Sequence, residues 1–255
     1  MKQIIKKIKE KKELSDLPDT LIEETLSNYL KKYNLTIPKS TKQQKIIIKE
    51  IRAELRKYTG RFQVSSKKRT VLLKGNKVRE LLKTHTSTKE RLPYYSRLIS
   101  LIKKYNPKSI LDLGCGLNPI AIAKKFPTAK YYAYDIKESE LKLISHFFRE
   151  NKIPGKTKVT DIRKLTKLPK TDITLILKTL DIIETKGHPH ATNIMKNLNS
   201  KNIIVSFSTK TLSGKPMNSP RRQWFENLLH SQRLGFKIFR IPNEVFYLIE
   251  KPLPQ

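Results

Sequence analysis

Apolar residues recur at spacings of three and four along the first third of the chain, which is the pattern of amphipathic helices. This pattern predicts three helices, over residues 21–33 behind Asp19 as N-cap, over 40–60 between Ser40 and Gly60, and over 78–82. A short period of two makes residues 71–73 a candidate strand. The pattern as a whole predicts an all-helical domain over residues 1–95.

Beyond residue 105 the pattern changes to short β-branched runs that alternate with helical stretches. Strands are predicted at residues 109–113, 130–134, 156–159, 172–177, 202–207, 235–241 and 245–249. Helices are predicted between them at residues 119–126, 137–151 and 187–199. The alternation indicates an α/β domain over residues 96–255, with a mostly parallel, Rossmann-like sheet of seven strands that closes in an antiparallel pair.

Length and composition narrow the class of protein. The 255 residues fit one large domain or a medium domain with an added module. A single cysteine excludes a disulfide framework and a cysteine-cluster metal site, so no metal is expected. The longest uncharged stretch has 11 residues, whereas about 18 are needed to cross a bilayer. With no secretory signal pattern at the N-terminus, we expect a soluble cytoplasmic protein.

The charge of the chain is strongly basic and unevenly spread. There are 54 basic and 22 acidic residues, for a formal net charge of +32. Residues 1–30 have no net charge, whereas residues 31–97 carry 20 basic and 4 acidic side chains. A lysine-rich genome would spread lysine evenly, so this concentration favours a polyanionic partner. We expect the partner to be a nucleic acid and not a membrane. The alternatives are an acidic membrane surface and an acidic protein.

A glycine-rich turn follows the strand predicted at 109–113. Asp112 lies in that strand, and Gly114 and Gly116 lead into a helix. Two glycines let the backbone pass close to a ligand, but the third glycine of a dinucleotide fingerprint is missing and the carboxylate would repel a phosphate. Asp135 ends the next strand 19 residues after Gly116, the spacing of a carboxylate that binds ribose hydroxyls. The turn therefore predicts a cationic, phosphate-free cofactor such as S-adenosyl-L-methionine.

Five segments, in order, resemble one family. They read HTSTKER at 85–91, DLGCGLNP at 112–119, LILKTL at 175–180, VSFSTKTLSGK at 205–215 and QWFE at 223–226. With Asn243-Glu244 and Phe246-Tyr247, they are similar to the aminoglycoside-resistance 16S rRNA methyltransferases, which methylate N7 of guanine 1405 in the decoding site. The resemblance covers about residues 85–250. It implies S-adenosyl-L-methionine as cofactor, 16S rRNA in the 30S subunit as partner, a monomer, and an rRNA-binding role for residues 1–95.

The motif and the resemblance together assign roles to single residues. Those assigned to the cofactor are His85, Thr86, Ser87, Arg91, Asp112, Gly114, Gly116, Asp135, Asp161, Ile162 and Leu177. Among them, the resemblance implies that Arg91 pairs with the methionine carboxylate, Asp135 holds the ribose and Asp161 accepts from the adenine amine. A structural hydrogen bond explains His85 equally well. The residues implied on the acceptor side as catalytic are Lys178, Glu184 and Lys210, and Lys215 shares an rRNA-facing loop with Lys210.

Two positions depart from the family pattern, which usually has proline at Asp181 and commonly glutamine at Lys186. Both lie beside the predicted pocket for the target base. A methyltransferase of another rRNA or tRNA base therefore stays open as an alternative. A non-catalytic RNA-binding protein on the same scaffold is the alternative from a different class.

A few other residues have both a functional and a structural interpretation. Trp224 is predicted to stack on the target base or to belong to a helix core. Cys115 is expected to pack, and His188 and His190 to lie in a surface loop. The basic run at residues 67–69 is predicted to contact phosphate. Since guanine N7 has a free lone pair, methyl transfer to it needs positioning and no general base.

Overall fold

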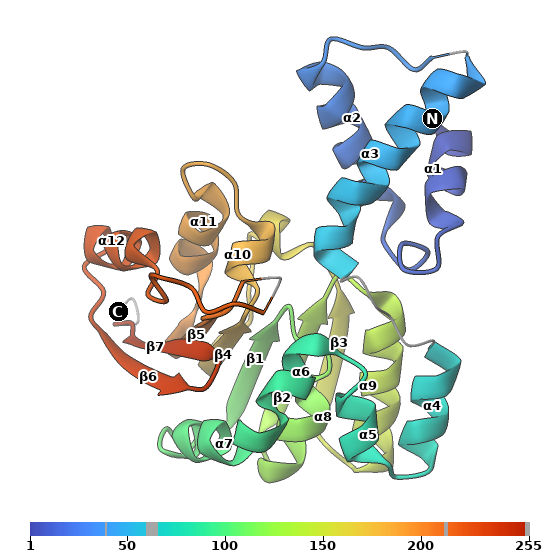
Figure 1. The fold of residues 1–255 in the computed structure, drawn as a ribbon. Helices are drawn as coiled ribbons and strands as arrows, with labels where there is room; N and C mark the ends of the chain where they lie inside the picture. The colour runs from blue at the N-terminus through green and yellow to red at the C-terminus, as the bar shows by residue number, and fades with distance from the viewer. Residues whose placement is uncertain (39, 60–65, 212–213, 253–255) are drawn as a thin grey trace.

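A computed structural model of the chain describes residues 1–38, 40–59, 66–211 and 214–252. Its first part is a bundle of three helices, α1 (Lys2–Lys9), α2 (Asp19–Lys32) and α3 (Thr41–Thr59). Their apolar faces meet in a buried cluster that includes Ile8, Leu26 and Leu55. Figure 1 shows the bundle standing above one edge of a sheet.

The helices predicted at 21–33 and 40–60 are confirmed as α2 and α3, with small changes at their ends. Asp19 is the first residue of α2 and Pro18 takes the N-cap position, so the predicted capping role of Asp19 is wrong. The predicted end at Gly60 lies outside the described residues. The pattern did not predict α1, because its buried residues Ile4, Ile5 and Ile8 cover little more than one turn.

Four helices connect the bundle to the sheet: α4 (Ser66–Lys74), α5 (Val78–Leu82), α6 (Thr86–Arg91) and, after the 3-10 turn Leu92–Tyr94, α7 (Tyr95–Lys103). Residues 71–73 belong to α4, so the candidate strand there is wrong. Leu72 and Leu73 of α4 pack against the same core as Leu81 and Leu82 of α5. The buried apolar residues thus belong to the core of the bundle up to Leu55 and to a core of the sheet from Leu81 onward. The domain division between residues 95 and 96 stays a prediction.

The second part is built on a sheet with strand order β3-β2-β1-β4-β5-β7-β6. The strands are β1 (Ser109–Leu113), β2 (Lys130–Asp135), β3 (Gly155–Val159), β4 (Thr171–Leu177), β5 (Ser200–Ser208), β6 (Phe236–Ile241) and β7 (Glu244–Glu250). Strands β1 to β5 are parallel, and β7 runs antiparallel to both β5 and β6. The seven predicted strands and the antiparallel pair are confirmed, with ends moved by at most two residues.

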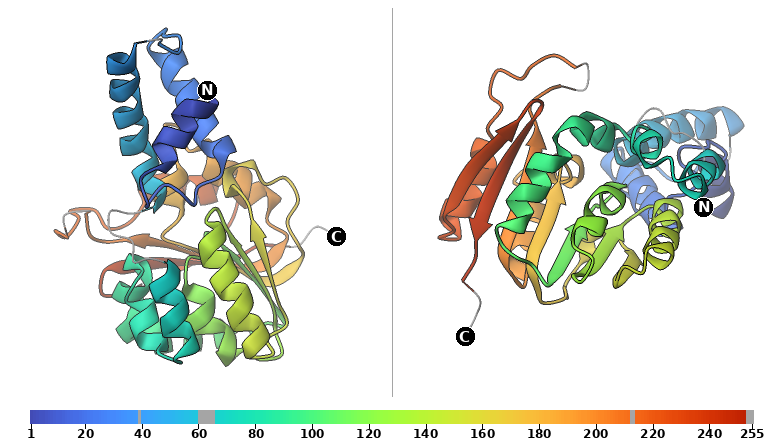
Figure 2. Two further views of the ribbon diagram at one scale, coloured as in Figure 1. Left: turned by 90° about the vertical axis from the view of Figure 1, so that its right-hand side faces the viewer. Right: turned by 90° about the horizontal axis from the view of Figure 1, so that it is seen from below.

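Helices cover both faces of the sheet (Figures 1 and 2). One face packs on α5, α7, α8 (Asn118–Ile122, extended by the 3-10 turn Ala123–Lys125) and α9 (Glu138–Glu150). The other packs on α10 (Leu180–Ile183), α11 (Pro189–Asn197) and α12 (Gln223–Ser231). Alternation along β1 sends Ile110 to the first core and Leu111 to the second. This architecture brings the carboxyl ends of β1 to β5 to the edge beneath the bundle.

Candidate functional site

The turn after β1 requires glycine for two reasons. Gly114 and Gly116 have left-handed backbone conformations, with φ of +66° and +48°. A Cβ on Gly114 would also come within 2.6 Å of Thr179, and one on Gly116 within 2.9 Å of His85 Nε2. The backbone therefore passes close to the N-cap side chain of α6 and to that of the helix after β4.

Asp135, at the end of β2, fixes this turn. Its Oδ2 accepts a hydrogen bond from the Gly116 amide at 2.9 Å, and its Oδ1 accepts one from the Lys137 amide at 3.1 Å. The turn lies beside Asp135 because β1 and β2 pair in parallel. Burial raises the pKa of this carboxyl above its ordinary value. Asp135 thus lies at the predicted place for a ribose-binding acid and also organises the glycine turn.

Asp112 is a second buried carboxyl near the same edge. Its Oδ2 accepts a hydrogen bond from the Tyr131 hydroxyl at 2.8 Å, whereas its Oδ1 is buried with no hydrogen-bond partner among the described residues. Burial raises its pKa to about 8. An unpartnered buried oxygen is costly, which favours a need for this acid beyond packing.

Asp112 is expected to make the fold less stable as the pH rises from about 4 to about 8. The unfolded carboxyl ionises near 3.8, while the folded one keeps its proton to about pH 8, so the folded state binds the extra proton in this window. Asp112→Asn is expected to remove this contribution. Urea unfolding at several pH values is expected to show the variant gaining stability relative to the wild type as the pH rises, and a constant difference would contradict the raised pKa.

Arg91, the last residue of α6, is fully buried and its guanidinium is bound within the chain. Its Nε and Nη2 donate to the carboxylate of Glu244 at 3.0 and 2.6 Å, and its Nη1 donates to Asn118 Oδ1 at 2.7 Å. Glu244 also accepts from the Ser206 hydroxyl. The predicted bidentate fork is present, but in this structure a carboxylate of β7 occupies it in place of the predicted methionine carboxylate.

His85 lies over the glycine turn, with Thr86 and Ser87 in the first turn of α6. Its Nε2 is 4.0 Å from Glu140 Oε2, and its buried Nδ1 has no hydrogen-bond partner within the ranges that the structure describes. Burial lowers the pKa of His85 to about 4, so the ring is neutral at neutral pH. The structural hydrogen bond is thus not observed, and cofactor contact by His85, Thr86 and Ser87 stays a prediction.

Asp161 follows β3 as the N-cap of the 3-10 turn Ile162–Lys164. Its carboxylate accepts from the Arg163 amide and Nε, both at 3.0 Å. Burial opposes ionisation, but these hydrogen bonds prevail and lower the pKa of Asp161. Arg163 also reaches Glu24 of α2 at 3.3 Å, which links the bundle to this edge. Ile162 and Leu177 are buried in the two cores.

Of the residues predicted on the acceptor side, Lys178 is close to the Arg91–Glu244 pair. It follows β4 in a left-handed conformation, and its ammonium donates to Glu90 at 2.5 Å and lies 3.8 Å from Glu244. Glu184 instead accepts from the amides of His190 and Ala191 at 3.2 and 2.7 Å. The structure therefore gives Glu184 a capping role at the start of α11.

The other residues with two interpretations behave structurally, but the predicted surface loop is wrong for His190, which lies in α11 behind His188 as N-cap. Trp224 stacks on His188 with ring centroids 4.0 Å apart, which favours the structural interpretation of Trp224. Cys115 is buried, and burial raises the pKa of its thiol well above the ordinary value, as fits packing. Arg69 is 5% exposed and donates to Glu140 at 2.9 Å and to Thr84, so the predicted phosphate contact of Arg69 is wrong. Its neighbours Lys67 and Lys68 are exposed.

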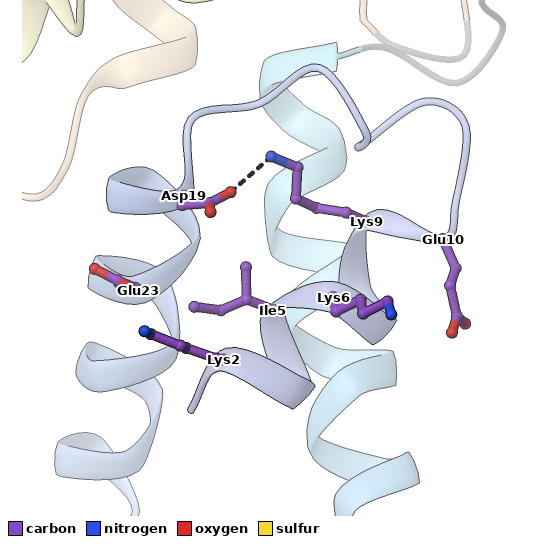
Figure 3. A pocket seen from close by; sticks show the side chains of 7 residues that line it. All are labelled: Lys2, Ile5, Lys6, Lys9, Glu10, Asp19 and Glu23. Carbon is purple, nitrogen blue, oxygen red and sulfur yellow. Dashed lines mark hydrogen bonds and ion pairs between the residues drawn. The ribbon is translucent and has the colours of Figure 1, made fainter.

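A groove of about 590 Å³ lies in the bundle between α1 and α2. Figure 3 shows its rim of lysine and acidic side chains, among which Lys9 and Asp19 pair at 2.6 Å. This groove is remote from the glycine turn, where the strand ends gather. We therefore place the candidate site at the carboxyl edge of the sheet, where Asp112, Asp135 and Asp161 come from three neighbouring strands or their ends.

Most of the chain matches a known family. The profile described as ribosomal RNA methyltransferase (FmrO) matches residues 69–248. The chain belongs to this family. Its match begins in α4, after the bundle, so the bundle lies outside the matched part.

Relatives and solved structures agree with this membership. Two curated relatives are named 16S rRNA (guanine(1405)-N(7))-methyltransferase. The one from Micromonospora echinospora is 30% identical over 68% of this chain and 66% of its own length, and the one from Serratia marcescens is 30% identical over 73% and 75%. The 16S rRNA methylase RmtB is 25% identical over 98% of both chains, with a TM-score of 0.81. The 16S rRNA methyltransferase RmtF, solved with S-adenosyl-L-homocysteine, shares the fold at 22% identity and a TM-score of 0.82, over 98% of both chains.

Several residues that organise the carboxyl edge of the sheet were not predicted from the sequence. They are Glu140, Arg163, Thr179 and Arg222. No local pattern marks Glu140, Arg163 or Arg222, whereas Thr179 lies in the segment LILKTL but was assigned no role. Glu244 lies in a segment that carried the resemblance, yet its pairing with Arg91 joins positions 153 residues apart.

Proposed function

We propose that the chain transfers a methyl group from S-adenosyl-L-methionine to N7 of guanine 1405 in the 16S rRNA of the 30S subunit. The observation that carries this proposal is the family match. It is combined with the glycine turn at the carboxyl edge of the sheet, where Asp112, Asp135 and Asp161 also lie. Acidic groups at successive strand ends would repel a phosphate. They therefore suit a cofactor that carries positive charge and no phosphate. The similarity to the 16S rRNA methylase RmtB over 98% of the chain supports 16S rRNA as the substrate, and the names of the two curated relatives support guanine 1405.

The chain's own residues supply binding and orientation. When bound, S-adenosyl-L-methionine supplies an activated methyl group, and guanine N7 supplies a lone pair. Asp135 and the glycine turn would hold the ribose end, and Asp161 with Ile162 the adenine end. Lys178, with its neighbours Glu90 and Glu244, borders the acceptor side, and Lys210 reaches toward rRNA. Because N7 has a free lone pair and carries no proton, no general base is required, and holding the two reactants in line can be worth about 7–11 kcal/mol.

The bundle and the helix after it supply the rRNA contacts in this proposal. A partner in the 30S subunit accounts for the charge of residues 31–97 and for the position of the bundle above the carboxyl edge. We also propose a cytoplasmic monomer whose activity gives aminoglycoside resistance. None of the helices in the described part of the chain has an apolar run that could span a bilayer.

Reversing two exposed charges on α4 is expected to weaken rRNA binding selectively. Lys67→Glu/Lys68→Glu is expected to raise the Kd for 30S subunits about ten-fold or more and to reduce its salt dependence, because each lost phosphate contact removes about one unit of slope. The Kd for S-adenosyl-L-homocysteine is expected to stay unchanged. Lys103→Glu/Lys104→Glu, at the last residue and the C-cap of α7, makes the same charge change away from the bundle and serves as control. Equal losses in both variants would reject a specific contact by α4.

The proposed function is tested by incubating the purified chain with labelled S-adenosyl-L-methionine and ribosomal particles. Label is expected in 30S subunits and not in 50S subunits or tRNA. Transfer to tRNA alone would replace the proposed substrate by another RNA. Cofactor binding without transfer to any RNA would favour a binding role for the scaffold.

A further inference from the structure

Asp181 and Arg222 form an ion pair that the proposed function does not use. Arg222 Nε and Nη2 donate to Asp181 Oδ2 at 3.1 and 2.8 Å. Asp181 lies on α10, three residues after Lys178, and Arg222 is the N-cap residue of α12. The pair therefore joins the helix beside the acceptor side to the end of the segment between β5 and α12.

The described parts of that segment, residues 209–211 and 214–221, are named the arm. Its two flanks pair with each other: the Met217 amide donates to the Thr209 carbonyl at 2.9 Å, and Lys210 and Pro216 form an antiparallel bridge. Figure 2 shows the arm, in orange and brown, projecting from the body of the sheet. Its side chains Lys210, Lys215 and Arg221 are exposed. A basic projection of this kind suits contacts with RNA phosphates.

Arg222 fastens both ends of the arm. Its Nη2 donates to the Ser208 carbonyl, where the arm begins, at 2.9 Å, and its Nη1 donates to the Pro220 carbonyl, near the end, at 3.2 Å. The guanidinium also lies over the Phe207 ring, 5.4 Å from its centroid. The backbone amide of Arg222 donates to the Tyr247 hydroxyl at 2.9 Å. One guanidinium thus connects α10, the end of β5 and both flanks of the arm.

The charge of this guanidinium makes Asp181 necessary to the arrangement. The Arg222 side chain is 10% exposed, so its charge is largely withdrawn from water, and Asp181 is its ion-pair partner. A planar guanidinium held by a carboxylate on one side and carbonyls on the other has a fixed orientation. Without the carboxylate, water must enter or Arg222 must turn outward, and either change releases the carbonyls at the base of the arm.

We propose that Asp181 and Arg222 are positioning residues for methyl transfer, which clamp the base of the arm to α10 and so hold Lys210 and Lys215 in place beside the acceptor side. This proposal rests on the proposed function, because rRNA is there the partner of the arm. Neither side chain is assigned to the reacting atoms. The departure from the family pattern at Asp181 is then a different way to fix the arm and need not mark a different target base.

Asp181→Ala tests the clamp through three measurements on the full chain. The KM for 30S subunits is expected to rise about ten-fold with a smaller change in kcat, because the arm is displaced while the cofactor edge is intact. The Kd for S-adenosyl-L-homocysteine is expected to stay within two-fold. Deuterium exchange at the Met217 amide is expected to become faster in the free protein. Glu138→Ala, which removes an exposed carboxylate paired with Lys142 on α9, is the control and is expected to change none of these.

Arg222→Met and the double variant complete a cycle. If the two residues act as one clamp, the double variant loses no more 30S activity than the more damaged single variant. Additive losses, an unchanged KM for 30S in Asp181→Ala, or unchanged exchange at Met217 would each overturn the proposal. Failure of the wild type to methylate 30S would instead reject the proposed function, and exchange in the free protein would still decide whether the clamp exists.

Discussion

Replacing Glu244 by glutamine is expected to lower the free energy of unfolding by about 3–5 kcal/mol, the usual cost of removing one partner of a buried ion pair. Arg91 has no exposed surface and Glu244 is 1% exposed, so water cannot replace the lost charge. Burial by itself lowers the pKa of Arg91, but the carboxylate of Glu244 holds that pKa above its ordinary value. Glutamine keeps the shape and leaves Arg91 charged and without its counter-charge.

Urea unfolding of Glu244→Gln measures this loss directly. Glu250→Gln removes an exposed carboxylate from the end of the same strand and is expected to change stability by less than about 0.5 kcal/mol. A loss of methyl transfer is also expected, since Lys178 lies 3.8 Å from Glu244. If Glu244→Gln were as stable as Glu250→Gln, the buried pair would not hold α6 to β7.

The second large effect is expected at the cofactor. Asp135→Asn is expected to weaken binding of S-adenosyl-L-homocysteine about 100-fold, because the carboxylate both organises the glycine turn and is the proposed ribose acceptor. Hydrogen bonds to charged groups are worth about 1.5–3 kcal/mol each. Asparagine has one oxygen for the amides of Gly116 and Lys137, so one of them loses its acceptor.

Isothermal titration calorimetry with S-adenosyl-L-homocysteine checks this expectation, and the sheet provides a matched control. Asp172, near the start of β4, accepts from the backbone amides of Lys108 and Ser109, both at 2.8 Å, at the opposite edge of the sheet. Asp172→Asn therefore removes a similar carboxylate where no cofactor is proposed, and its affinity is expected to stay unchanged. Equal affinity losses in the two variants would show a general loss of folding and contradict the assigned role of Asp135.

The sheet could be predicted from the sequence because its signals are local. Runs such as SILDL and DITLIL are buried on both faces over most of their length and are therefore mainly apolar, and the helical stretches between them indicate the parallel order. The same reasoning failed at α1 and at residues 71–73. Both α1 and α4, which contains residues 71–73, are short helices with few apolar residues. Their structure depends on packing against the rest of the chain.

The residue types at the candidate site could also be predicted, but their partners could not. The sequence indicates an arginine at position 91 able to bind a carboxylate, and β7 supplies that carboxylate from 153 residues away. Arg69 and Glu140 meet across 71 residues, and Arg222 and Asp181 across 41. Such pairs depend on the three-dimensional fold, which the spacing of neighbouring residues does not record.

The central claim is methylation of guanine N7 at one position of 16S rRNA. The most direct test is to incubate 30S subunits with the chain and S-adenosyl-L-methionine, and then to map 7-methylguanine by borohydride reduction and aniline cleavage. We predict a single new cut at guanine 1405 that is absent when the cofactor is omitted. A cut at another guanine, or methyl incorporation without any cut, would contradict the account.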